Sequence, residues 1–112
     1  MVMILILTKR ATVEELKRVA EDFGGLYIKV VVDVGRGILA AGGERHFDAE
    51  QKLLEDGSNQ PDLWGGGVDV KVGEIDYNSM INLRPNQDNL SREILSSEIR
   101  KEFDKILRRL LL

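Results

Sequence analysis

The stretch that decides the fold is residues 26–42, LYIKVVVDVGRGILAAG. Its first part is long and β-branched, which is typical of a buried strand. A turn at Gly35-Arg36-Gly37 then leads into a second apolar run. A three-residue turn with Gly37 in the left-handed region would pair Val34 with Ile38 and Val32 with Ala40. The stretch therefore predicts a β-hairpin whose two faces must be covered by the rest of the chain.

The segment before the hairpin predicts a strand and a helix. Residues 2–7 are apolar on both faces, which suits a central strand covered on each side better than an edge strand. Thr12 then opens a helix with Glu15 in the capping-box position, and Gly24 ends it. The buried stripe of this helix is Leu16, Val19, Ala20 and Phe23. Strand, helix and strand in this order favour a right-handed crossover with parallel strands, and an antiparallel arrangement stays open.

The middle of the chain predicts a short helix and a loop. Asp48 is a good N-cap for a helix through Glu55, with Gln51 in the capping-box position and Gly57 after the end. A glycine-rich loop through Gly67 follows.

The last third predicts a second hairpin and a final helix. Apolar residues alternate with polar ones from Val68 to Leu83, and a two-residue turn at Gly73-Glu74 would pair Val70 with Tyr77 and Lys71 with Asp76. The final helix starts near Ser96 or Ser97, and its apolar face is Ile99, Phe103, Ile106, Leu107 and Leu110. The whole chain, 1–112, is predicted to be a single α+β domain. It would have a mixed β-sheet of about five strands in two hairpins, packed with two main helices and one short helix.

Composition narrows the function classes. Charged residues make up 31% of the chain and the net charge is only −3, so nucleic acid is an unexpected partner. The absence of cysteine excludes disulfides and thiolate metal sites and favours a cytoplasmic protein. The apolar N-terminal run is too short to span a membrane, so no membrane association is expected.

Three polar runs hold the candidate site: residues 42–50, 57–65 and 82–89. They contain the only His, the only Trp and both Pro of the chain. Amide and guanidinium groups beside predicted strands and turns favour a specific hydrogen-bonding site for a small polar or anionic ligand. The candidate ligand-binding residues are Ser58, Gln60, Trp64, Asn82, Arg84 and Gln87.

His46 and Glu50 are the candidates for catalysis and for metal binding. They would align on one face of a helix, whereas on a strand Asp48 would join them. A divalent metal, or a His base oriented by a carboxylate, is the functional interpretation, and a metal-assisted enzyme would follow from it. In the structural interpretation Asp48 caps the helix, Glu50 is a solvated acid and His46 is a loop residue.

Two further features have competing interpretations. Trp64 with Gly65-Gly66-Gly67 could form the wall of a ligand pocket, or Trp64 could plug the core beside a flexible turn. The glycines match neither a P-loop nor a dinucleotide fingerprint, so the cofactor is unknown and a nucleotide is not predicted. Leu110, Leu111 and Leu112 cannot all face one core from a helix, which favours a homo-oligomer. In that alternative the protein is a non-enzymatic interaction protein, and its polar motif is a structural hydrogen-bond network.

Three segments of the chain together resemble a bacterial and archaeal family, domain of unknown function 5674. The resembling residues are 32–50, 53–65 and 79–89, in that order along the chain. The family carries no established activity, so the resemblance implies membership without a mechanism. Its members tend to have Asn shortly after the Trp-Gly pair, where this chain has Gly65-Gly66-Gly67. A contact made by that Asn elsewhere in the family would be missing in this chain.

Overall fold

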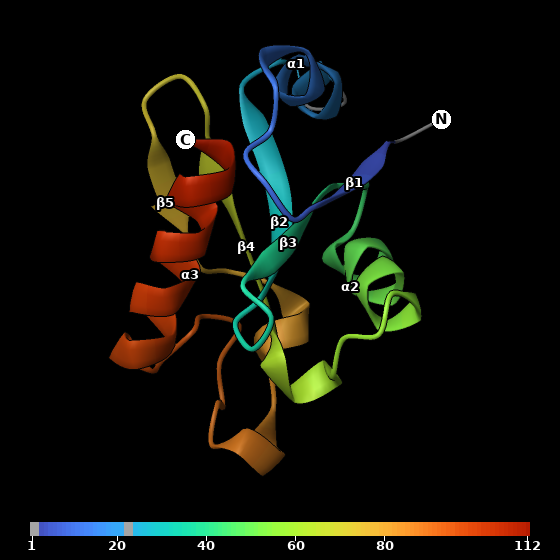
Figure 1. The fold of residues 1–112 in the computed structure, drawn as a ribbon. Helices are drawn as coiled ribbons and strands as arrows, with labels where there is room; N and C mark the ends of the chain where they lie inside the picture. The colour runs from blue at the N-terminus through green and yellow to red at the C-terminus, as the bar shows by residue number, and fades with distance from the viewer. Residues whose placement is uncertain (1–2, 22–23) are drawn as a thin grey trace.

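The computed structural model describes residues 3–21 and 24–112 and confirms an α+β fold (Figure 1). Five strands form one sheet in the order β1-β3-β2-β4-β5. The strands are β1 (Ile4–Leu7), β2 (Tyr27–Asp33), β3 (Ile38–Gly42), β4 (Leu63–Asp69) and β5 (Glu74–Asp76). The helices are α1 (Val13–Glu21), α2 (His46–Glu55) and α3 (Ser97–Leu111), and the 3-10 turns are η1 (Gln60–Asp62), η2 (Met80–Asn82) and η3 (Pro85–Gln87).

Helices cover both faces of the sheet. In Figure 1, α3 and α2 lie on opposite sides of the central strands. One core cluster joins α1 and α3 to one face through residues such as Val30, Val32 and Phe103. A second, smaller cluster joins α2 to the other face through Val31, Ala40 and Leu53. Both faces of β2 and β3 are therefore buried, which explains why their sequences are continuous apolar runs.

The predicted mixed sheet is wrong, because every neighbouring pair of strands is antiparallel. The crossover through α1 does make β1 and β2 run in the same direction, but β3 inserts between them and pairs with both. β1 is consequently an edge strand and not the expected central one. Its apolar character on both faces has another cause: Leu5 packs on one core cluster, and Ile4 and Ile6 pack on the other. Val2 lies outside the described residues.

The two main helices are confirmed with their caps. The Thr12 backbone N–H donates to Glu15 Oε1 (2.9 Å), and the Glu15 N–H donates back to Thr12 Oγ1 (3.1 Å), as a capping box requires. Ser96 caps α3 by accepting from the Ile99 N–H at 3.2 Å. Phe23, which was assigned to the buried stripe of the first helix, lies outside the described residues.

Both hairpins were predicted, but in the wrong register. Each is closed by a four-residue loop that starts after an aspartate, with Asp33 paired to Ile38 and Asp69 paired to Glu74. Asp33 Oδ1 accepts two loop N–H groups, and Asp69 Oδ1 does the same in the second loop. The loops end at Gly37 and Gly73, whose φ angles of 70° and 73° favour glycine. The aspartate side chain therefore sets the loop length, and the predicted pairs Val32 with Ala40 and Lys71 with Asp76 do not form.

The predicted glycine-rich loop is instead part of β4, an inner strand of the sheet between β2 and β5. Gly65, Gly66 and Gly67 pair with β2 along its length. A Cβ atom on Gly66 would lie 2.3 Å from the Asp76 carbonyl oxygen, and one on Gly67 would lie 1.9 Å from Tyr27 Oη. Glycine is needed there because neighbouring groups approach the strand too closely for any side chain.

The terminal leucines do fit one core, contrary to expectation. Leu110 and Leu111 are buried, and Leu112 packs against the same cluster. They fit because α3 is covered on more than one side: it contacts β2 and β3, while Leu111 and Leu112 line a cavity with Leu16 of α1. The terminal leucines therefore do not support a homo-oligomer, which stays a prediction.

Candidate functional site

Most of the polar side chains predicted to bind a ligand contact the backbone of one short segment, residues 61–66. Arg84 stacks on the Trp64 ring, with Cζ 4.3 Å from the ring centroid. Its guanidinium donates to the carbonyl oxygens of Ile81 (2.9 Å), Pro61 (3.2 Å) and Leu63. Arg84 and Trp64 are both buried. Arg84 therefore fixes the start of β4, and its guanidinium makes a cation–π contact with the Trp64 ring.

Asn82 fixes the next part of the same segment. Its Oδ1 accepts from the Gly65 N–H at 2.8 Å, and its Nδ2 donates to the Gly65 carbonyl at 2.9 Å. Nδ2 also lies 3.0 Å from the carbonyl oxygens of Tyr77 and Arg92. The side chain is fully buried and lies in η2, not on the strand that was predicted for this region. A buried amide can act in this way as a substitute for a neighbouring strand.

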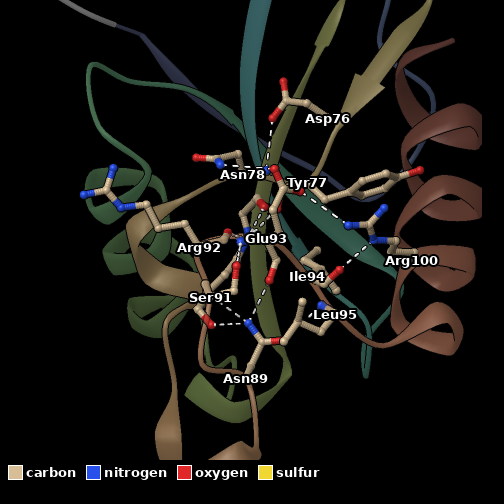
Figure 2. Close-up of polar contacts among 12 residues, drawn as sticks. Asp76, Tyr77, Asn78, Asn89, Ser91, Arg92, Glu93, Ile94, Leu95 and Arg100 are labelled. Atoms are coloured by element: carbon tan, nitrogen blue, oxygen red, sulfur yellow. Dashed lines mark hydrogen bonds and ion pairs between the residues drawn. The ribbon is translucent and has the colours of Figure 1, made fainter.

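A second buried amide, Asn89, organises the segment that leads to α3 (Figure 2). Its Nδ2 donates to the carbonyl oxygens of Asn82 (2.7 Å), Ser91 (3.0 Å) and Glu93 (2.9 Å), and its Oδ1 accepts from the Leu95 N–H (3.0 Å). Sequence reasoning did not select Asn89. Its position in an irregular stretch gave no periodicity that would reveal burial.

Ser58 belongs to a different contact, between the first hairpin and the end of α2. It donates to Asp33 Oδ2 at 2.6 Å and accepts from Arg36 Nη1 at 2.8 Å. Arg36 also pairs with Asp56 at 2.9 Å. Asp33 is fully buried, so these bonds satisfy a carboxylate that would otherwise be costly to bury.

Glu50 is buried beside Arg84 and Gln60. Its Oε2 atom has no hydrogen-bond partner among the described residues. Burial raises the pKa of the Glu50 carboxyl above its ordinary value of 4.5, while Arg84 and a hydrogen bond with Gln60 lower it. Gln87 accepts from Arg84 at 3.2 Å and donates to the Pro61 carbonyl at 3.1 Å. Glu50 is therefore not the solvated acid of the structural interpretation.

Replacing Glu50 with Gln is expected to make the protein more stable at neutral pH and to reduce the pH dependence of its stability. A carboxyl whose folded-state pKa is raised contributes stability that is complete below the unfolded pKa and is lost as pH rises through the folded pKa. Gln imitates the neutral form at every pH. The check is urea unfolding of both proteins between pH 4 and pH 8. A variant less stable than the wild type at pH 7 would mean that the Arg84 attraction outweighs burial.

His46 is the first residue of α2, and it contacts β4. Its Nε2 lies 2.7 Å from the Gly66 carbonyl oxygen, so Nε2 must carry the proton that is shared in this bond. Burial lowers the pKa of His46 from its ordinary value of 6.5, and Lys29 lowers it further, whereas the Gly66 bond and Asp76 raise it. His46 is consequently neutral at pH 7, with Nδ1 as an acceptor.

The helix that carries His46 starts three residues earlier than predicted. Arg45 is its N-cap residue, and Asp48 lies in its first turn, where it pairs with Arg45 at 3.0 Å. The prediction that Asp48 is the N-cap of this helix is therefore wrong. His46 and Glu50 do share the inner face of a helix, but within residues 3–21 and 24–112 no three His, Cys, Asp or Glu side chains are grouped so that they could hold a metal.

A cavity lies beside the first turn of α2. Its volume is about 270 Å³, and it is lined by Lys29, Arg45, His46, Phe47, Ser79, Met80 and Ile81. Lys29 comes from β2 and donates to the Glu44 carbonyl at 2.6 Å. Of the residues predicted for the site, His46 is the one that lines this cavity. Lys29 and Arg45 were missed because a strand Lys and an Arg before a helix look like ordinary solvated residues.

Comparison with known proteins identifies the chain by family alone. No curated protein and no solved structure matches it. No helix within the described residues is long and apolar enough to cross a membrane. The model of the family described as "Protein of unknown function (DUF5674)" matches residues 5–110. The chain therefore belongs to this family, as its three resembling segments predicted.

Proposed function

We propose that the protein binds a small anionic ligand in the cavity beside the first turn of α2. The observation that carries this proposal is the meeting of two cationic side chains, Lys29 from β2 and Arg45 from the start of α2, at one cavity. The N-terminus of a helix adds partial positive charge and N–H donors. The N-cap residue of α2 is Arg45, whose side chain pairs with Asp48 and makes no cap hydrogen bond to these N–H groups.

The remaining polar candidates have other roles in this proposal. Asn82 and Arg84 donate to carbonyl groups of the scaffold, Gln87 donates to the Pro61 carbonyl, and Ser58 donates to Asp33. These contacts favour the hydrogen-bond network that was the alternative interpretation of the polar motif. Anion binding is compatible with a structural hydrogen-bond network. The network fixes the positions of β4 and η2, and η2 supplies lining residues of the cavity. The lack of cysteine continues to favour the cytoplasm as the compartment.

Inorganic phosphate and acetate, titrated into the protein and followed by amide NMR shifts, test the proposal. Shifts are expected at residues around the cavity. Arg45→Gln and Lys29→Gln should each weaken binding by about fivefold or more, since each removes a charge-assisted hydrogen bond. Asp48→Asn should strengthen binding, because it releases Arg45 from its carboxylate partner.

The matched control is Lys105→Gln, which removes the same charge from an exposed position on α3. It should leave binding unchanged except for a small effect of net charge, which salt will screen. Equal losses in all three charge-removing variants, or no shifts with either anion, would refute the proposed site.

A further inference from the structure

The cavity beside α2 has two chemically different walls. Lys29 and Arg45 supply positive charge, whereas Phe47, Met80 and Ile81 supply apolar surface. Phe47 is 50% exposed and Met80 is 60% exposed, although both are large apolar side chains. Exposed apolar groups are common one at a time, but here two of them flank one cavity together with cationic groups.

The charged and aromatic groups are adjacent to one another. Arg45 Cζ lies 5.7 Å from the centroid of the Phe47 ring. A ligand whose anionic group reaches Arg45 is therefore also within reach of the Phe47 ring. Aromatic rings pack favourably at centroid distances of about 4.5–7 Å, and methionine sulfur makes favourable contacts with ring edges.

The size of the cavity limits the ligand. About 270 Å³ is slightly below the usual range of about 300–1,000 Å³ for sites that enclose drug-sized molecules. A dinucleotide or a long peptide would not fit inside. A single ring with one short anionic substituent has a suitable size and uses both walls.

We propose that the ligand of this cavity is an aromatic carboxylate whose carboxylate pairs with Arg45 and Lys29 and whose ring packs against Phe47 and Met80. The inference rests on the proposed anion site and names its ligand class.

Acetate, benzoate, cyclohexanecarboxylate and inorganic phosphate, titrated in parallel by amide NMR shifts, test this inference on the full chain. Benzoate is expected to bind about tenfold more tightly than acetate, because its ring leaves water on binding. Benzoate should also bind more tightly than cyclohexanecarboxylate. Phe47→Ala and Met80→Ala should each weaken benzoate binding more than acetate binding, and so reduce the preference for benzoate.

The control for these truncations is Leu90→Ala, which removes an exposed apolar side chain that does not line the cavity. Each outcome has a separate meaning. Equal affinities for acetate and benzoate, or for benzoate and cyclohexanecarboxylate, would overturn the aromatic ligand class and leave the anion site standing. Absence of binding by all four compounds would overturn the anion site itself.

Discussion

Replacing Asn82 with alanine is expected to lower the free energy of unfolding by about 3–5 kcal/mol, because the buried N–H and carbonyl of Gly65 lose the partner that Asn82 provides. The amide accepts from the Gly65 N–H and donates toward the carbonyl oxygens of Gly65, Tyr77 and Arg92. Each buried group that loses its partner costs about 1–3 kcal/mol, and the costs are not fully additive. Since a domain of this size has about 5–15 kcal/mol in total, the loss would be large.

Urea unfolding monitored by far-UV circular dichroism measures this effect. Asn86→Ala is the matched control, since Asn86 is an exposed amide in the same polar run. Asn82→Asp provides a second test: it keeps the shape and the acceptor but replaces a donor with an oxygen that would face carbonyl oxygens. Both Asn82 variants should be much less stable than the control. A loss at Asn82→Ala within 1 kcal/mol of the control would show that water can replace the amide.

The elements that were predicted correctly are those specified by local chemistry. The Thr12 and Glu15 capping box and the Ser96 cap each involve residues three positions apart, so the sequence displays the whole interaction. The hairpin loops were also encoded locally, by Asp33 with Gly37 and by Asp69 with Gly73. They were misjudged because turn length was inferred from glycine alone, without the aspartate side chain that accepts the loop N–H groups.

The glycine strand could not be predicted in this way. Glycine is depleted in strands, so any prediction from local sequence propensity assigns Gly65-Gly66-Gly67 to a loop. What requires glycine there is the close approach of Asp76, Phe103 and Tyr27, which are distant in sequence. Tertiary contact therefore overrides local propensity, and the information that decides the conformation lies outside the segment.

The partners of the candidate site residues could not be predicted either, because they too lie far away in the sequence. Sequence reasoning identified polar residues that are unusual for a surface, and the structure places most of them around residues 61–66. It did not reveal that their partners would be backbone groups, since only the fold determines which carbonyls are buried. Lys29 and Arg45, which line the cavity, are common residues in unremarkable positions. Their meeting depends on the packing of α2 against β2.

Gly66→Ala is expected to destabilise the protein by more than about 3 kcal/mol, in the upper range for overpacking of a core. The added Cβ would lie 2.3 Å from the Asp76 carbonyl oxygen and 2.7 Å from Phe103 Cζ. The first contact is with backbone that pairs β5 to β4, so relieving it requires those strands to separate. Elsewhere in a strand the same substitution would be favourable, because alanine restricts the unfolded chain.

Gly73→Ala is the matched control for this variant. Gly73 has a φ of 73° and open space around its Cα, so alanine there costs about 1–2 kcal/mol of backbone strain without any contact. Urea unfolding should rank Gly66→Ala well below Gly73→Ala in stability, and comparable losses would show that β5 can move away at little cost. The Gly66 carbonyl also positions His46 through the 2.7 Å bond to Nε2. If β4 shifts to make room for the alanine Cβ, His46 moves with it, and His46 lines the proposed anion cavity. Stability and anion affinity should therefore fall together in Gly66→Ala, whereas Gly73→Ala should lower stability alone.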